Sequence, residues 1–254
     1  MIMLLAQVDK SMQTVLCIFV IFLPFMAFAQ GNTSLDSYSE AKRLLYGAVY
    51  RDHRFTVYCG AAFDANRHVT LPEGFVIPEY HDRAYRAETE HIVAAENFGR
   101  AFTEWREGAP QCIDSEGKRF KGRKCAGTNR EFRLMESDLH NLAPAIGAVN
   151  AMRRNYRFGV LPTAAPNFGS CPMKVSGRVA EPPDQAKGLI ARTQLYMADA
   201  YSSRYRLSRS QRQLFEVWNT RYPPDEWECR RERRIARIQG NHNNFTEKLC
   251  PKAN

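Results

Sequence analysis

The sequence predicts a single-domain α+β fold that is mostly helical. Local helix signals dominate the last third of the chain, whereas residues 54–80 hold short apolar runs broken by glycine, asparagine and proline, a pattern typical of strands and loops. The chain has 254 residues, of which 44% are hydrophobic and 11% aromatic, so it is globular rather than disordered. No internal repeat or low-complexity tract divides it, and its length allows one sizeable core.

Residues 1–29 have the features of a secretory signal peptide. Lys10 precedes an apolar stretch over residues 15–26, and Ala27-Phe28-Ala29 forms a small-x-small cleavage site. The alternative is an uncleaved membrane anchor, which the shortness of the apolar run disfavours. No later stretch approaches eighteen consecutive apolar residues, so we expect the mature chain, residues 30–254, to be a soluble exported domain without a membrane partner.

A first helix is expected from about Ser37. Ser37 and Glu40 have capping-box spacing, and four apolar residues recur on one face behind them: Ala41, Leu44, Leu45 and Val49. Residues 90–93 should form a strand end or a tight loop. Residues 106–130 are polar and rich in glycine, lysine and arginine, which predicts a long loop, and residues 144–150 lead into a short helix or turn.

Loops resume over residues 158–176, and three helices follow them. Pro182-Pro183-Asp184 begins the first, Ser208 with Gln211 forms a second capping box, and Pro223-Pro224-Asp225 begins the third, which Gly240 ends. The large apolar residues of the last two helices are expected in the core: Phe215, Trp218, Trp227 and Ile235.

Six of the seven cysteines remain after signal cleavage, because Cys17 leaves with the signal. An even set in an oxidising compartment indicates three disulfides, for which sequence alone allows fifteen pairings: Cys59, Cys112, Cys125, Cys171, Cys229 and Cys250. A zinc site is the rival interpretation, but no C-x-x-C spacing supports it.

The formal net charge is +9, and it stays +9 in the mature chain because Asp9 and Lys10 cancel within the signal. Such an excess favours an anionic partner, either nucleic acid or an acidic membrane surface. Many exported proteins are basic without binding either partner, so the charge alone decides little.

Two clusters carry candidate chemistry. Glu90-His91 alone would usually be structural, but residues 135–142 add Glu136, Asp138 and His140, and Asn150 follows. Together they offer oxygen ligands for a hard divalent cation and a free imidazole as a base. Phosphodiester hydrolysis needs this combination, because a metal offsets charge in the transition state while a neutral histidine takes a proton from water.

These clusters resemble the motifs of the bacterial endonuclease I family, non-specific periplasmic or secreted nucleases with a ββα-metal (His-Me) finger. Arg86-x-Glu88-x-Glu90-His91-Ile92-Val93 is similar to R-x-E-x-E-H-V-V, and residues 135–150 match M-E-x-D-x-H-N-L-x-P-x-x-G-x-V-N almost throughout. Further matches extend the resemblance from about Ser37 over the mature chain: Phe98-Gly99, Trp105, Met173-Lys174-Val175, Glu181-Pro182-Pro183, Gly188-x-Ile190-Ala191-Arg192-Thr193, Trp227-Glu228-Cys229 and Gln239-Gly240-Asn241-His242-Asn243.

The resemblance implies roles for matching residues. His91 would be the general base, and Glu90 and Asn150 the ligands of one Mg²⁺, with Mn²⁺ or Ca²⁺ as structural substitutes. Glu136 would hold the metal through water or orient the base. Arg123, in Gly122-Arg123-Lys124-Cys125, would contact the scissile phosphate, although an insertion of roughly a dozen residues precedes it.

The chain also departs from the family pattern. Ala94, Asn244 and residues 151–155 differ from the usual residues, which puts substrate preference in doubt more than activity. Two family cysteine positions hold Glu104 and Ala61 instead, and Cys112 in the insertion could pair with Cys125. That pairing would hold a basic loop that we expect to contact phosphates through Lys118, Arg119, Lys121 and Lys124. Two further candidates for nucleic-acid binding, Arg153 and Arg192, lie outside the loop.

Other polar residues have ordinary explanations. His53, His68 and His81 lie outside the matched motifs and are expected on the surface or in packing. His140 is expected to hydrogen-bond around the site rather than to bind metal. The basic residues from 230 to 237, like Arg192, should form mostly solvated helical faces.

The expected function is therefore an exported, monomeric endonuclease that cuts double- and single-stranded DNA, and RNA, with little sequence preference. It would use one Mg²⁺ and leave 5′-phosphate ends, as the resemblance implies. One alternative is a catalytically inactive exported protein that only binds nucleic acid. Another is a disulfide-stapled structural or inhibitory protein that acts on a protein partner.

Overall fold

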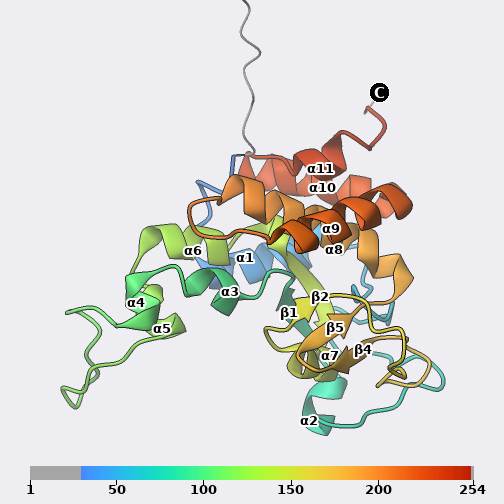
Figure 1. The fold of residues 1–254 in the computed structure, drawn as a ribbon, viewed down its shortest axis with the longest axis horizontal. Coiled ribbons are helices and arrows are strands. Elements are labelled where there is room, and N and C mark those ends of the chain that lie inside the picture. The colour runs from blue at the N-terminus through green and yellow to red at the C-terminus, as the bar shows by residue number, and fades with distance from the viewer. Residues whose placement is uncertain (1–29, 253–254) are drawn as a thin grey trace, which may run out of the picture.

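The computed structural model describes residues 30–252, so the expected signal peptide lies outside the described part of the chain. A layer of long helices covers one side of a short strand pair, and loops with small sheets form the other side (Figure 1). The helices are α1 (Tyr38–Leu44), η1 (Leu45–Val49), α2 (His81–Ala84), α3 (Ala95–Gly99), α4 (Thr103–Arg106), α5 (Arg123–Ala126), α6 (Arg130–Glu136), η2 (Leu139–Asn141), α7 (Gly147–Arg153), α8 (Asp184–Ala200), α9 (Arg209–Arg221), α10 (Glu226–Gln239) and α11 (Asn244–Glu247). The strands are β1 (Ala87–His91), β2 (Leu142–Ile146), β3 (Arg157–Phe158), β4 (Lys174–Ser176) and β5 (Val179–Glu181).

The helix starts predicted from the sequence are confirmed. Ser37 accepts a hydrogen bond from the backbone N–H of Glu40, and Ser208 caps α9 in the same way. Asp225 caps α10, and Gly240 ends it in the left-handed conformation with φ of 84°. These signals were readable because capping is a contact between residues only a few positions apart.

The strand pair β1–β2 leads directly into α7 and forms a ββα unit. The strands are antiparallel, and the register sets His91 opposite Leu142 and Ala87 opposite Ile146. A short helix over the end of residues 144–150 is confirmed, but β2 was not predicted. All five of its residues are buried, so no polar alternation marks it. Pro144 is tolerated because β1 is the only strand paired with β2 in the described residues, and on the other edge the Pro144 carbonyl accepts from the Val57 N–H.

The prediction of one long loop over residues 106–130 is partly wrong. α5 and the start of α6 lie within this range, and residues 107–122 are irregular apart from a bridge between Ile113 and Arg119. This irregular segment extends away from the rest of the molecule beside α4 and α5 (Figure 1). The disulfide Cys112–Cys125 ties it to α5, which confirms the expected pairing, and two further disulfides join Cys59 to Cys171 and Cys229 to Cys250.

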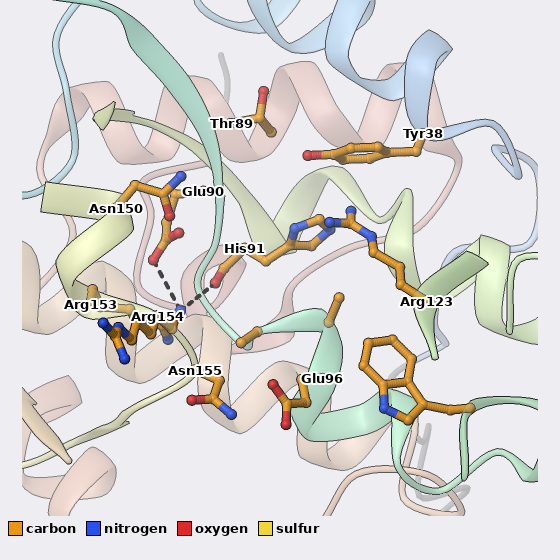
Figure 2. Close-up of a pocket in the computed structure, with 13 residues that line it drawn as sticks. Tyr38, Thr89, Glu90, His91, Glu96, Arg123, Asn150, Arg153, Arg154 and Asn155 are labelled. Carbon is orange, nitrogen blue, oxygen red and sulfur yellow. Dashed lines mark hydrogen bonds and ion pairs between the residues drawn. The ribbon is translucent and has the colours of Figure 1, made fainter. Parts of the chain in front are cut away.

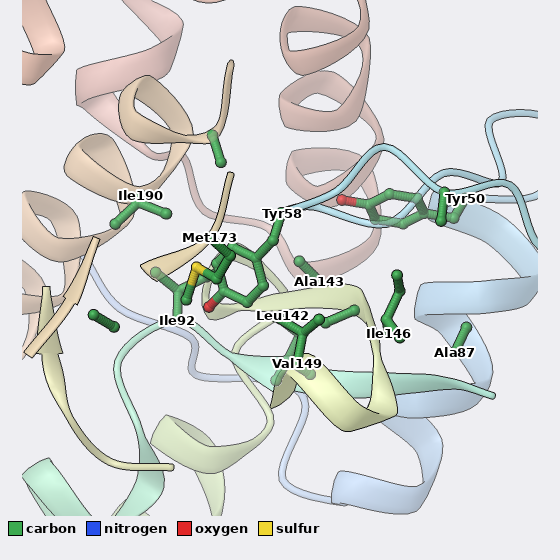
Figure 3. Packing of buried hydrophobic residues seen from close by; sticks show 14 of the residues in the cluster. Tyr50, Tyr58, Ala87, Ile92, Leu142, Ala143, Ile146, Val149, Met173 and Ile190 are labelled. Atoms are coloured by element: carbon green, nitrogen blue, oxygen red, sulfur yellow. The ribbon is translucent and has the colours of Figure 1, made fainter. Parts of the chain in front are cut away.

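The main core lies between the strand pair and the helical layer. Ile92, Leu142, Val149 and Ile190 pack there together (Figure 3), and a smaller aromatic cluster around Phe132 lies beneath α6. Phe215, Trp218 and Ile235 are buried as predicted. Trp227 is only partly buried, and its ring stacks on His53 with centroids 3.9 Å apart. His68 and His81 are exposed, as expected.

Two arginines expected on solvated helical faces are buried instead. Arg192 is 1% exposed and pairs with Glu228, its Nε lying 2.6 Å from Oε1. Arg231 donates 2.9 Å hydrogen bonds to the carbonyls of Leu139 and Leu142. The prediction of Arg192 as a nucleic-acid contact is therefore wrong, because α8 is enclosed by α9, α10 and α11 and its basic side chain faces the interior.

Candidate active site

An open pocket of about 430 Å³ lies where β1 ends, between α3, α5 and α7. Five of the candidate site residues line it: Glu90, His91, Arg123, Asn150 and Arg153. Figure 2 shows them converging from different elements. Glu136 adjoins the pocket through Arg123, so the structure brings together every candidate catalytic and metal-binding residue.

Glu90 lies at the floor of this pocket and is 3% exposed. Its Oε1 accepts a 2.6 Å hydrogen bond from the Tyr58 hydroxyl and lies 3.0 Å from Nη1 of Arg153. Burial raises the pKa of Glu90, while the Arg153 guanidinium and the Tyr58 hydroxyl act in the opposite direction. Both contacts fall on Oε1, and Oε2 has no hydrogen-bond partner among residues 30–252.

His91 is held in one tautomer. Its Nε2 lies 2.8 Å from the backbone carbonyl of Glu136, and a carbonyl can only accept, so Nε2 carries the proton. Burial lowers the pKa of His91 to about 3, with the nearby Arg123 acting in the same direction, so the imidazole is neutral at physiological pH. Nδ1 has no hydrogen-bond partner among residues 30–252, and its lone pair can accept a proton. The Tyr38 ring stacks on the imidazole with centroids 5.1 Å apart.

Arg123 begins α5 and reaches back over the pocket. Its Nε donates to Oε1 of Glu136 at 2.5 Å, and its guanidinium lies 4.9 Å from the centroid of the Tyr38 ring. About half of the side chain, 47%, stays exposed, so nitrogen atoms remain for an incoming anion. Glu136 thus fixes Arg123 with its carboxylate and His91 with its carbonyl.

Asn150 is oriented by a chain of polar contacts. Its Nδ2 donates to Glu88 at 2.9 Å, and Glu88 accepts two hydrogen bonds from Arg83. Because the amide nitrogen is committed to Glu88, Oδ1 is left as an available oxygen. Gly147 allows the start of α7 to lie close to the backbone of Arg83, since a Cβ at residue 147 would lie 2.4 Å from the Arg83 carbonyl oxygen.

The oxygen pair of Glu90 and Asn150 fits a cation that keeps most of its own water. No group of three or more histidine, cysteine, aspartate or glutamate side chains in residues 30–252 is arranged to hold a metal. Mg²⁺ does not require such a group, because it retains several waters and binds through one or two carboxylates together with substrate phosphates. One carboxylate oxygen and one amide oxygen facing an open pocket meet that requirement.

The remaining predicted residues lie outside the catalytic centre. Lys118, Arg119 and Lys121 are exposed on the irregular segment of residues 107–122, and Lys124 is exposed on α5. The segment returns to the pocket where Gly122 N–H donates to the carbonyl of Trp105. His140 is fully buried in the helical layer, with Nε2 3.1 Å from the carbonyl of Asn241, and it does not line the pocket.

Arg153 requires a correction. It was expected to contact nucleic acid, but it is 1% exposed, and its Nη1 pairs with Glu90 and donates to the carbonyl of His91 at 2.9 Å (Figure 2). Its neighbour Arg154 is exposed and lines the same pocket. The arginine that faces solvent at the end of α7 is therefore Arg154 and not Arg153.

Several functional residues were missed at the sequence level. Tyr38 and Tyr58 lie more than 30 residues before Glu90, so no spacing connected them with the site, and Trp105 was quoted as a matched position without a role. Glu88 was quoted only as part of a motif, although its position two residues before Glu90 places it on the same strand and could have indicated a supporting role.

Comparison with known proteins agrees with the motif resemblance. The endonuclease I family model matches residues 47–250. A periplasmic deoxyribonuclease of Aeromonas hydrophila is 41% identical over 209 residues, which cover 80% of this chain and 82% of the relative. An extracellular deoxyribonuclease of the same species is 38% identical, covering 85% and 90%. Endonuclease-1 of Buchnera aphidicola is 34% identical, covering 86% and 84%.

Proposed function

The chain belongs to the endonuclease I family, and on that basis we propose that it is an exported, metal-dependent endonuclease that hydrolyses DNA. The observation that carries the proposal is His91. It is neutral, fixed by a carbonyl at Nε2, and free at Nδ1 beside two oxygen ligands and an arginine. A catalytic base, a metal site and a phosphate contact are what phosphodiester hydrolysis requires.

Each side chain has a distinct part in the proposed reaction. Nδ1 of His91 takes the proton of the attacking water, while the Glu136 carbonyl keeps the ring from turning. Arg123, held by the Glu136 carboxylate, offsets the charge that develops on the phosphate. Glu90 and Asn150 would hold one Mg²⁺, which adds positive charge against the phosphoryl oxygens. Of the two roles that the resemblance implies for Glu136, the contacts with His91 and Arg123 support orientation of the base.

The same proposal covers the fold element, the substrate and the location. β1, β2 and α7 would be the His-Me finger, because they carry Glu90, His91 and Asn150 on consecutive elements. We propose cleavage of double- and single-stranded DNA and of RNA, by a monomer, with 5′-phosphate products. Residues 1–29 would direct export, which agrees with relatives named as periplasmic or extracellular enzymes. No helix in residues 30–252 is long and apolar enough to cross a bilayer.

Cleavage of supercoiled plasmid tests this function. We expect wild-type protein to nick the plasmid with Mg²⁺ and to stop in EDTA, and His91→Ala to lose about 10²- to 10⁴-fold in rate. His68→Ala is the matched control, because His68 is exposed and lines no pocket described above. Isothermal titration of Mg²⁺ into Glu90→Gln should show weaker binding than wild type.

Three outcomes would count against the proposal. Cleavage that persists in EDTA would show that the reaction needs no metal. A fully active His91→Ala protein would show that His91 is not the base. DNA binding without metal-dependent cutting would instead indicate a catalytically inactive binding protein. Digestion of RNA and labelling of product ends with and without phosphatase test the finer claims.

A further inference from the structure

A second open pocket, of about 410 Å³, adjoins the catalytic pocket and shares Asn155 with it. Three arginines line it, Arg100, Arg157 and Arg178, and no carboxylate does. We call it the arginine pocket. Its polar lining and three positive charges suit an anion and oppose a cation or an apolar ligand.

The backbone presents two of these arginines to solvent. Arg157 and Phe158 form β3, and since neighbouring strand residues face opposite sides, burial of Phe158 places Arg157 outward. Arg178 lies in the two-residue turn Gly177-Arg178 between β4 and β5, where φ is 55° and 63°. A left-handed conformation is uncommon outside glycine, asparagine and aspartate, so an arginine there is held against its local preference.

The charges of Arg157 and Arg178 are not balanced within the protein. Neither has an ion pair with any carboxylate of residues 30–252, whereas Arg100 pairs with Glu96. The adjacent Arg154, which lines the catalytic pocket, donates to the Tyr80 hydroxyl at 3.0 Å and has no ion pair with a described carboxylate. A line of unneutralised guanidinium groups thus leads from the catalytic pocket into the arginine pocket.

We propose that the arginine pocket binds a backbone phosphate of the same nucleic-acid strand, next to the scissile phosphodiester. The inference rests on the proposed nuclease function. A strand seated in the catalytic pocket carries a further phosphate at each neighbouring nucleotide, since each strand has one phosphate per about 3.4 Å of helix axis. Guanidinium groups form bidentate hydrogen bonds to phosphate, and these contacts do not depend on the base sequence, which fits an enzyme without sequence preference.

The double variant Arg157→Gln with Arg178→Asn tests this pocket, and asparagine is chosen because it tolerates positive φ. Binding of a fluorescein-labelled 12-base-pair duplex is followed by anisotropy in EDTA between 50 and 200 mM NaCl. Each lost phosphate contact lowers the slope of log affinity against log salt by about 0.9. We therefore expect the wild-type affinity to fall about 3.5-fold more than that of the variant over this range, the factor for one phosphate contact.

Arg237→Gln is the matched control, because Arg237 is exposed on α10, lines neither pocket and has no carboxylate partner among the described residues. A slope that falls equally in the control would overturn the proposal, as would an unchanged slope in the double variant. Arg157→Lys with Arg178→Lys should restore the slope, since the charge returns.

Cleavage separates this proposal from the nuclease function itself. With Mg²⁺, the double variant should lose kcat/KM on the duplex relative to wild type, and that loss should be about 3.5-fold larger at 50 than at 200 mM NaCl. On a dinucleotide, whose single phosphate cannot fill both pockets, the difference from wild type should be less than about twofold. Equal losses on both substrates would overturn the proposed phosphate binding by the arginine pocket but not the nuclease function. A wild-type protein that cuts neither substrate would refute the nuclease function.

Discussion

Replacing Arg153 by methionine would show whether this arginine binds nucleic acid or holds the site together. Its guanidinium pairs with Glu90 at 3.0 Å and donates to the backbone carbonyls of His91 and Ile92, and its side chain is 1% exposed. Methionine keeps much of the aliphatic length but leaves the Glu90 carboxylate buried without its cation. The structure therefore predicts a loss of stability rather than a direct loss of DNA contacts.

The size of the effect follows from the burial of the pair. Removing one partner of a buried ion pair costs about 3–5 kcal/mol, mostly because the remaining charge is uncompensated. For a domain of this size each kcal/mol lowers the melting temperature by about 2–4 °C, so Arg153→Met should melt roughly 6–20 °C below wild type. Adding Glu90→Gln removes the stranded charge and should recover part of that loss.

Thermal unfolding and DNA anisotropy, both in EDTA, distinguish the two roles. Arg154→Gln is the matched control, because Arg154 is the next residue, is exposed, and has no ion pair with a carboxylate of residues 30–252. We expect that variant to melt as wild type does and to bind DNA less tightly. An Arg153→Met protein with an unchanged melting temperature would refute the reasoning, and so would a Glu90→Gln addition that destabilises it further.

Two further predictions concern the groups around the site. Cys112→Ser with Cys125→Ser should lower the free energy of unfolding by about 3 kcal/mol for a bridge with a sequence separation of 13, and should slow plasmid nicking because α5 carries Arg123. Gentle reduction should slow wild type in the same way, and equal rates before and after reduction would contradict this. Glu88→Gln should weaken Mg²⁺ binding about tenfold in calorimetry, because the Asn150 amide loses its charged acceptor; unchanged affinity would show that Asn150 needs no such support.

The sequence predicted the elements whose signals are local. The starts of α1, α9 and α10 were readable because each depends on a side chain bonding to a backbone group three residues away. β2 was not readable, since a strand buried on both faces has no alternation, and a proline at its centre argues against a strand until the sheet edges are known.

The candidate site shows the same division between local and distant contacts. Glu90, His91, Glu136 and Asn150 could be selected from their motifs, but the supporting aromatic rings could not, because contacts such as Tyr58 to Glu90 join residues 32 positions apart. The arginines were the least predictable. The buried Arg153 and the exposed Arg154 are adjacent in the chain, and the end of α7 between them decides which one faces solvent.

That division among arginines explains how an open, polar pocket can be rigid. His91 and Leu142 are paired in register at the end of the β1–β2 ladder. Buried Arg153 donates to the carbonyl of His91, and buried Arg231 donates to the carbonyl of Leu142. Carbonyls at a strand end need partners once they are removed from water, and an arginine supplies several donors in a fixed plane. His91, the proposed base, is thus held from both strands by buried arginines, and the exposed arginines that we propose as phosphate contacts make no bond to it.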